Sequence, residues 1–166
     1  GRYLMCLSKA QVWLVDTVDC GVDYIEGSIG MRVAFTANGD RLVIGHGEAT
    51  EGKIEVWSLG KRLSDLAFEK EYRGRKADPF GVGNSAIVYH GHTEEDSLLV
   101  QDFGGGEPVI AAYNSGLLDD SIGRYDSSAT VIQMTPRGTR VALGLADGTF
   151  GVWATDATIN GFAPKE

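Results

Sequence analysis

The sequence has few cysteines and no long hydrophobic run, and these absences exclude several classes of protein. Cys6 and Cys20 are its only two cysteines, and their spacing matches neither a zinc site nor a redox motif. Two cysteines also cannot make the disulfide framework of a small secreted domain. We therefore predict that both are reduced and that the protein is intracellular, in the cytoplasm. No apolar stretch reaches about eighteen residues, so no membrane-spanning helix is predicted.

Basic residues and prolines are scarce as well. The 15 lysines and arginines are outnumbered by 23 aspartates and glutamates, which gives a formal net charge of -8. That balance argues against nucleic acid as a partner, because a general phosphate-backbone binder needs a basic face, and it does not favour a membrane partner. Only 4 prolines occur beside 23 glycines. Together with many short apolar runs, this favours short strands joined by tight turns.

The sequence does contain an internal repeat. Two clear copies run from Arg32 to Trp57 and from Thr130 to Trp153. Each copy has a short apolar segment, a turn with glycine (Gly39 and Gly138), a continuous apolar run and a segment that ends in tryptophan. The copies differ in length only in the turn before the tryptophan segment, as expected when insertions fall in loops.

Two further copies are visible. The first residues repeat the last copy without a gap, with Arg2 placed over Arg140 and Val15 over Trp153. A weaker copy runs from Ser85 to Asp102. The spacing of the copies, in the forties to low fifties, is within reach of the period of about 40–50 residues that is typical of stacked four-stranded repeats.

Each copy is predicted to fold as a four-stranded antiparallel sheet, so the fold class is all-β. The continuous apolar runs indicate sheets with two apolar faces, which are stable only when stacked against neighbours. Val33 to Thr36 is predicted as the innermost strand of the second copy. Outer strands are predicted at Leu63–Tyr72, Pro108–Tyr113 and Thr158–Phe162. We expect a single domain, residues 1–166, divided into units at about 1–29, 30–74, 75–120 and 121–166.

These residues resemble the WD-repeat family. Val33–Gly39 followed by Leu42–Gly45 looks like its first two strands, and Asp147-Gly148 looks like its hairpin turn. Trp57 and Trp153 look like the ends of its third strand. The resemblance implies a β-propeller of about four divergent blades, the first without its innermost strand. The Gly-His pair of the family is missing before the first strands, so we do not expect its Asp-His-Ser/Thr-Trp hydrogen-bond network.

The resemblance also implies a ring of about seven blades, so we expect a partial or split propeller. The predicted function is a non-catalytic protein–protein interaction scaffold, a subunit of a complex. Another chain, or the remainder of the parent, would supply the missing strand and blades; a compact four-bladed ring is the alternative. We expect no cofactor and no catalytic residue, because no Gly-x-Ser-x-Gly elbow is present and Gly104–Gly106 lacks the Lys-Ser/Thr of a phosphate loop.

One alternative function is an enzyme that holds a metal or cofactor at the rim of the propeller. The candidate ligands are His46, His90, His92 and Glu94, which fall in the same turn of two adjacent copies. Imidazoles and carboxylates are suitable ligands for a divalent metal. The competing interpretation is that long polar turns are solvated and collect such residues without binding anything.

Two other segments have possible functions. Arg73 and Arg75 loosely resemble the Arg-Arg-Gly signature by which autophagy-related propellers bind phosphoinositides, although the order here is Arg-Gly-Arg. The competing interpretation is an ordinary solvated turn. A second segment, from Leu117 to Tyr125, is longer than a connection between blades requires. It is either a candidate partner contact or a loop without a role. Its candidate contact residues are Leu117, Leu118, Ile122 and Tyr125.

The three tryptophans are not predicted to form a ligand cage. Trp57 and Trp153 share one place in the repeat, which indicates packing in the core or between blades. Trp13 falls two residues earlier in its own copy, and we predict that it faces another way.

Overall fold

The computed structural model confirms an all-β protein. It describes residues 1–8, 10–26, 32–46, 52–84, 86–91, 98–104, 109–113, 123–124, 129–136, 139–145, 148, 150–155 and 162–164. Within these residues the strands form three hydrogen-bonded sheets, and the one helical segment is the 3-10 turn η1 (Leu63–Asp65). No helix in the described part of the chain has the length and apolar character needed to cross a membrane.

The first sheet has three antiparallel strands in chain order. They are β1 (Tyr3–Ser8), β2 (Gln11–Asp16) and β3 (Val22–Glu26). The side chains of β2 alternate between half-buried and buried, as expected for a strand with one face against a core. β1 is an edge strand of this sheet, and no described strand pairs with its other side.

The second sheet has eight strands. Along the sheet they are β4 (Arg32–Phe35), β5 (Arg41–His46), β6 (Gly52–Ser58), β7 (Ala67–Val82), β8 (Ala86–Gly91), β9 (Leu98–Asp102), β10 (Val109–Tyr113) and β11 (Gly123–Arg124). All neighbours are antiparallel except β10 and β11, which are parallel. The third sheet is four-stranded and antiparallel. Its strands are β12 (Ala129–Met134), β13 (Arg140–Leu145), β14 (Phe150–Thr155) and β15 (Phe162–Pro164).

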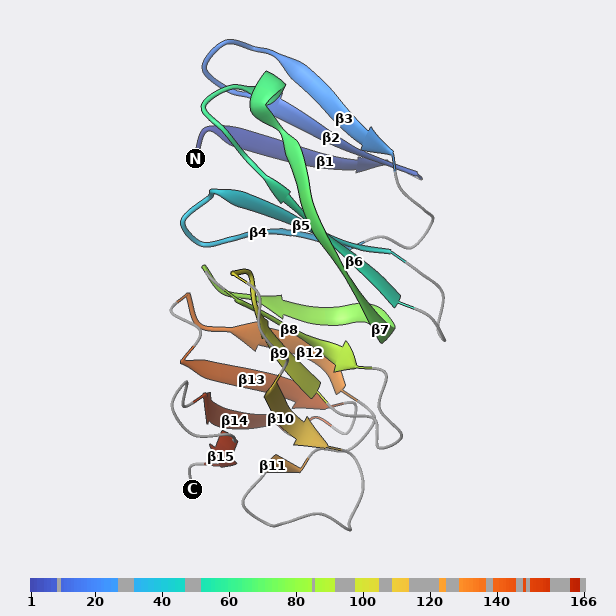
Figure 1. Cartoon of the computed structure of the whole chain (residues 1–166), viewed down its shortest axis with the longest axis vertical. Coiled ribbons are helices and arrows are strands. Elements are labelled where there is room, and N and C mark those ends of the chain that lie inside the picture. Colours follow the sequence, from blue (N-terminus) through green and yellow to red (C-terminus); the bar gives the residue numbers. More distant parts are fainter. Residues whose placement is uncertain are drawn as a thin grey trace.

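β7 joins two layers within the eight-stranded sheet. Its first half pairs with β6 and its second half with β8, and the register shifts between Gly74 and Lys76 and again before Gly81. Such irregularities bend a strand. The bend is visible in Figure 1, where β7 curves from the layer of β4–β6 to the layer of β8–β10. The chain therefore forms four layers, and the predicted division between residues 74 and 75 falls inside a continuous strand.

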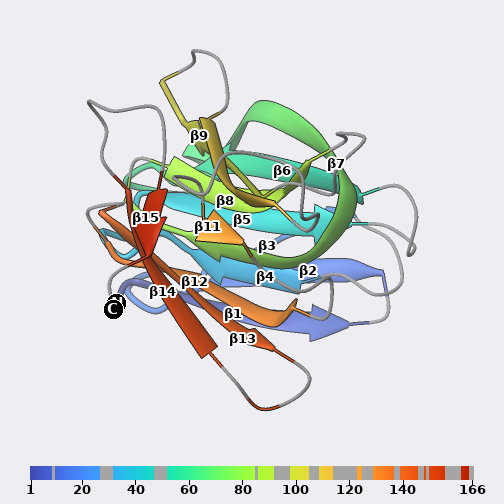
Figure 2. The same ribbon diagram turned by 90° about the horizontal axis from the view of Figure 1, so that it is seen from below.

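The four layers stack along the long axis of the molecule (Figure 1). The first sheet lies at one end of the stack and the third sheet at the other, with the two layers of the eight-stranded sheet between them. Seen along the stack, the layers overlap one another (Figure 2). The described residues therefore form an open stack of blade-like layers, as predicted for a partial propeller, and not a compact ring of four.

Apolar side chains fill the three joints between successive layers. The joint between the first sheet and β4–β6 is formed by Val12, Leu14, Ile25, Leu42 and Ile44. The next joint is formed by Val43, Ile54, Val56, Phe80, Ile87, Tyr89, Leu99 and Phe103. The last joint is formed by Ala86, Val88, Leu98, Ile132, Met134, Val141 and Leu143. Each inner layer thus buries both of its faces, which explains its continuous apolar runs.

The inner strands of two layers end in the same turn. Thr36 follows β4; its backbone N–H donates to the Arg41 carbonyl at 3.0 Å, and its hydroxyl accepts from the Arg41 N–H at 3.0 Å. Thr135 follows β12 and makes the same pair of bonds with Arg140, at 2.9 and 3.0 Å. Gly39 in the first of these turns has a φ of 72°, the left-handed conformation that glycine was predicted to supply.

The pairing of β1 corrects the gapless alignment of the first copy. Val15 pairs with Leu4, whereas Trp57 pairs with Leu42 and Trp153 with Val141. Leu4 is therefore the structural equivalent of Val141, while the gapless alignment put it one position further along. The reason is that the stretch of chain from Leu4 to Val15 is one residue shorter than the equivalent stretch from Val141 to Trp153.

Candidate functional site

The most distinctive surfaces of the chain are the two ends of the stack. We call the side of a layer that faces the preceding layer its leading face, and the side that faces the following layer its trailing face. Each joint packs the trailing face of one layer against the leading face of the next. The leading face of the first sheet and the trailing face of the third sheet have no described layer against them (Figure 1).

The leading face of the first sheet is apolar and exposed. Paired residues on neighbouring strands share a face, and the pairs Leu4–Val15, Trp13–Tyr24 and Val15–Val22 place these five side chains together. Leu4 is 59% exposed, and Val22 and Tyr24 are exposed as well. The rings of Trp13 and Tyr24 lie 5.1 Å apart, between centroids. Trp13 thus lies on the same kind of face as Trp57, which corrects the prediction that it faces another way.

The trailing face of the third sheet is also apolar. Phe150 is 80% exposed, and Val131 and Val152 are exposed beside it. Val131 and Phe150 both pair with Gly144, which confirms that they lie on one face. In the second layer, Ile54 pairs with the equivalent Gly45 and is 0% exposed. Each end of the stack is therefore one half of a joint whose other half is missing from the described residues.

A buried polar cluster lies on the leading face of β5, β6 and β7. Its centre is Glu55, a charged residue that is buried between apolar neighbours in β6. Lys53 Nζ lies 2.6 Å from Glu55 Oε1, and Trp57 Nε1 donates to Glu55 Oε2 at 3.0 Å. His46 Nε2 lies 3.3 Å from the same oxygen, outside hydrogen-bonding geometry. A carboxylate in this apolar strand is tolerated because two donors, both in β6, satisfy it.

His46 and Glu55 titrate at lower pH than usual. Burial lowers the pKa of His46 from its ordinary 6.5, although the Glu55 carboxylate acts in the opposite direction. For Glu55, burial alone raises the pKa, but the hydrogen bonds from Lys53 and Trp57 bring the pKa below 4.5. Both shifts favour the state found at neutral pH, a neutral imidazole beside an ionised carboxylate.

Acidification is therefore expected to destabilise the chain, starting with His46. The unfolded chain takes up a proton on this imidazole near pH 6.5, before the folded chain does, so stability is lost as the pH falls from 6.5 through the lower pKa of the folded state. We expect the variant His46→Gln to lose less stability than the wild type between pH 7.5 and about pH 5. Thermal unfolding followed by circular dichroism measures this. Parallel pH profiles for the two proteins would contradict the assignment.

Of the four candidate metal ligands, only His46 has a described side chain, so the metal site stays a prediction. His46 lies in β5, and its side chain is buried against Glu55 instead of in a solvated turn. His90 lies in β8, but its side chain is outside the described set, as are His92 and Glu94 altogether. Among the described residues no group of three histidine, cysteine or acidic side chains is placed to hold a metal ion.

The candidate lipid-binding arginines lie in β7. Arg73 is exposed, and its Nε donates to Glu71 Oε1 at 2.8 Å. Glu71 Oε2 in turn lies 3.7 Å from Lys53 Nζ, so Arg73 extends the Glu55 cluster. The side chain of Arg75 is outside the described residues. The candidate partner contacts Leu117, Leu118, Ile122 and Tyr125 also lie outside them.

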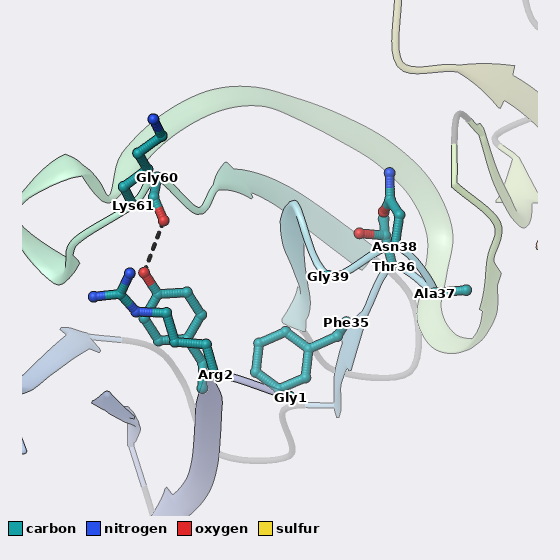
Figure 3. A pocket seen from close by; sticks show the side chains of 10 residues that line it. Gly1, Arg2, Phe35, Thr36, Ala37, Asn38, Gly39, Gly60 and Lys61 are labelled. Atoms are coloured by element: carbon teal, nitrogen blue, oxygen red, sulfur yellow. Dashed lines mark hydrogen bonds between the residues drawn. The ribbon is translucent and has the colours of Figure 1, made fainter. Parts of the chain in front are cut away.

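A hollow of about 520 Å³ lies between the first sheet and the turn after β4 (Figure 3). Arg2 and Tyr3 line one side, and Phe35 and Thr36 line the other. The Tyr3 hydroxyl donates to the Gly60 carbonyl at 2.7 Å, the dashed line in the figure. Sequence reasoning missed this hollow, because it depends on how two layers approach each other.

An ion pair beside the hollow fixes the start of β1. Arg2 Nε donates to Asp16 Oδ2 at 2.8 Å, and the Val18 N–H donates to Asp16 Oδ1 at 3.0 Å. The Arg2 hydrogen bond lowers the pKa of the Asp16 carboxyl, so Asp16 stays ionised at neutral pH. Asp16 was not among the candidate site residues predicted from the sequence. Its structural signal was an acidic residue at the end of an apolar strand.

Comparison with known proteins shows the fold but no family. No family model matches the chain, and no curated protein matches it. Among solved structures, the chain is similar to a protein of the mitotic checkpoint complex, with a TM-score of 0.64 and 12% identity over 98% of this chain and 48% of that one. It is also similar to the β-propeller domain of Cps50 (Swd1) from Myceliophteria thermophila, with a TM-score of 0.64 and 13% identity over 94% of this chain and 48% of that one.

A third similar structure is oligopeptidase B from Leishmania major, with a TM-score of 0.54 and 14% identity over 97% of this chain and 24% of that one. The first two structures are WD40 β-propellers, whereas the third is an enzyme, so the fold alone does not decide the function. The chain spans about half the length, or less, of these three structures. At such low identity the likeness shows that the chain folds as part of a β-propeller.

Proposed function

We propose that the chain is a non-catalytic interaction scaffold, a partial propeller completed by blades from another chain or from the remainder of its parent. The observation that carries this proposal is the pair of uncovered end faces. Phe150 occupies the place that Ile54 has in a buried joint, and Leu4 occupies the place of Leu42. Ile54 and Leu42 are fully buried, whereas Phe150 and Leu4 are exposed.

The energetics favour covering these faces. Burying one large apolar side chain contributes about 1.5–3 kcal/mol relative to leaving it in water. At least three such side chains are exposed at each end: Leu4, Val22 and Tyr24 at one, and Val131, Phe150 and Val152 at the other. Contiguous apolar surface of this kind is typical of interaction sites. Protein partners therefore fit the chain better than nucleic acid, given its net charge of -8.

Other features support the same proposal. We assign four blades at residues 1–29, 30–74, 75–120 and 121–166, with β7 running continuously from the second to the third. The WD40 propellers among the similar structures are of a type that is usually non-catalytic. The exposed, unpaired thiols of Cys6 and Cys20 support an intracellular, cytoplasmic location.

The proposal predicts association through the end faces. The wild-type chain is expected to show a native mass above that of one chain, rising with concentration, or to hold a partner in fixed proportion. The variants Phe150→Glu and Leu4→Glu are expected to weaken association by about tenfold or more, since each puts a charge into a desolvated joint. Sedimentation velocity and light scattering measure the mass.

The matched control is Val18→Glu. Val18 is an exposed apolar residue in the turn between β2 and β3, outside both end faces, so its charge is expected to leave association unchanged. A chain that stays a sealed monomer at every concentration, and that binds no hydrophobic dye at its ends, would overturn the proposal.

A further inference from the structure

The edge of β1 carries a row of backbone groups that no described strand satisfies. The Thr17 N–H donates to the Arg2 carbonyl at 2.8 Å, which makes Arg2–Thr17 a hydrogen-bonded pair of the ladder. Hydrogen-bonded and non-hydrogen-bonded pairs alternate in an antiparallel ladder. The N–H and C=O groups of Tyr3, Met5 and Leu7 therefore point away from β2, toward the open edge.

Two other layers show which kind of strand pairs with the equivalent edge. In them, β5 and β13 are the equivalents of β1, and each pairs on that side with an inner strand, β4 or β12. Val33 and Phe35 of β4 pair with Ile44 and Leu42; Ile132 and Met134 of β12 pair with Leu143 and Val141. Both inner strands are followed by the threonine that closes the turn. The shared pattern is apolar, any residue, apolar, threonine.

The register transfers directly to β1. Because Leu4 is the equivalent of Leu42, Cys6 is the equivalent of Ile44 and Tyr3 the equivalent of Arg41. A strand added to β1 therefore places its two apolar residues opposite Cys6 and Leu4. Its threonine comes opposite Tyr3, whose N–H and C=O face the edge as those of Arg41 do.

The hollow beside β1 provides room for the turn of such a strand. On this rim the turns of neighbouring layers are tied together: the Asn38 N–H donates to Asn84 Oδ1 at 2.9 Å, and the Asn84 N–H donates to the Pro136 carbonyl at 2.7 Å. The row stops at the hollow, which Thr36 and Asn38 line on one side and Arg2 lines on the other (Figure 3). The hollow therefore lies where the turn of one more inner strand would extend this row of turns.

We propose that the edge of β1 and this hollow form a docking slot for an extended segment of another polypeptide chain, with the pattern apolar-x-apolar-Thr, bound antiparallel to β1. This inference rests on the proposed scaffold function and names the site and the chemistry of one partner segment. Backbone hydrogen bonds would supply affinity and the alternate side chains would supply register, as in other cases of strand addition.

Cys6 makes the register measurable. Cys6 and Trp13 form a hydrogen-bonded pair, so Cys6 and its partner across the open edge form a non-hydrogen-bonded pair, whose Cα atoms lie about 4.5 Å apart. That distance is within the range that a disulfide bridges. The probe is a capped synthetic peptide with the sequence of residues 32–39 and the change Val33→Cys. The protein is the full chain with Cys20→Asn, so that Cys6 is its only thiol.

The expected result is position-specific cross-linking in a glutathione redox buffer. The matched peptide carries Ala34→Cys instead, which points its thiol to the opposite face of the sheet. We expect the Val33→Cys peptide to form at least about tenfold more mixed disulfide, because docking raises the effective concentration of its thiol. In the same peptide, Thr36→Val is expected to lower the yield. Equal yields from the two cysteine positions, or no yield above that of a scrambled peptide, would overturn the docking slot.

The outcome separates this inference from the proposed function. If Phe150→Glu and Leu4→Glu weaken association but the two peptides cross-link equally, the docking slot is wrong and the scaffold proposal stands. If the peptides discriminate but the chain remains a sealed monomer, the slot stands and the scaffold proposal is wrong. Thermal unfolding of the Cys20→Asn protein, compared with the wild type, verifies that the background change leaves the fold intact.

Discussion

Replacing Ile54 by alanine is expected to destabilise the isolated chain by about 2–5 kcal/mol, whereas Phe150→Ala is expected to cost less than about 0.5 kcal/mol. The two residues occupy the same place in their layers, since Ile54 pairs with Gly45 and Phe150 with Gly144. Ile54 is fully buried in the joint formed with Phe80 and Ile87. Phe150 has no such joint within the described residues, so its truncation removes little buried surface.

Urea unfolding at low protein concentration measures both free energies. Low concentration matters because association through the end face would itself stabilise the wild type. At concentrations where the chain associates, a different result is expected. Phe150→Ala then weakens association, in the same way that Ile54→Ala weakens folding. If Phe150→Ala destabilised the dilute chain as much as Ile54→Ala does, the trailing face of the third sheet would be covered within one chain, and the open stack would be wrong.

The strands were predictable from the sequence because their signals are local. The runs Leu42–Ile44 and Val141–Leu143 alternate between two apolar faces, and both lie in strands. All of Leu42–Ile44 is buried, whereas in the second run only Val141 and Leu143 are buried. The turns were equally local, since Gly39 takes the positive φ that its place after Asn38 predicted. Stacking of layers then follows, because a sheet that is apolar on both sides must bury both.

The register of the first strand was not predictable in the same way. Side chains alternate between the two faces of a strand, so an alignment that is wrong by one residue assigns every side chain to the wrong face. The gapless alignment gave Tyr3 the place of Val141, whereas the pairing with Val15 gives that place to Leu4. The length of the connection decides such a register, and the short connection between Ser8 and Gln11 has no marker residue in the repeat.

The outer strands were predicted less well. Leu63–Tyr72 was predicted as one strand, but Leu63–Asp65 forms the 3-10 turn η1, and β7 begins only at Ala67. The Asp65 carboxylate accepts from the Arg62 N–H at 3.1 Å, a local bond that competes with extended structure. β7 then continues beyond Tyr72 to Val82 into the next layer, because β8 offers a second partner edge.

The candidate site was the least predictable part. His46 was selected with other turn residues as a metal ligand, but pairing of β5 with β6 buries it near Glu55. Contacts across strands depend on register, which the sequence did not determine. The informative signal was Glu55 itself, a charge between Ile54 and Val56, because a carboxylate in a buried strand needs donors nearby. A partial propeller was expected to leave an apolar blade face in water, but which side chains lie on that face depends on the register of the strands.

Trp57→Ala is expected to destabilise the chain by about 3 kcal/mol, near the lower end of the range for truncating a core tryptophan, because Trp57 is only partly buried. Its ring packs on the joint of Leu42 and Ile44 and meets Phe68 edge-on, with 5.6 Å between centroids.

Trp57→Phe keeps most of this packing and removes the N–H that donates to Glu55. The loss of one hydrogen bond to a charged group is expected to cost about 1.5–3 kcal/mol. The control Trp13→Phe, on the exposed leading face, is expected to change stability by less than about 0.5 kcal/mol.

The pH dependence of Trp57→Phe separates the hydrogen bond from packing. The pKa of Glu55 is below 4.5 in part because Trp57 donates to its carboxylate, so Glu55 contributes stability that is present above pH 4.5 and is lost as the pH falls through the folded-state pKa. Removing the donor raises that pKa toward 4.5. The cost of Trp57→Phe is therefore largest at neutral pH and shrinks in acid, whereas a pure packing defect costs the same at both. Urea unfolding followed by far-ultraviolet circular dichroism, at neutral pH and below pH 4.5, measures the difference. A cost that does not change with pH would show that Trp57 acts through its ring alone and that Glu55 depends on Lys53 for its ionised state.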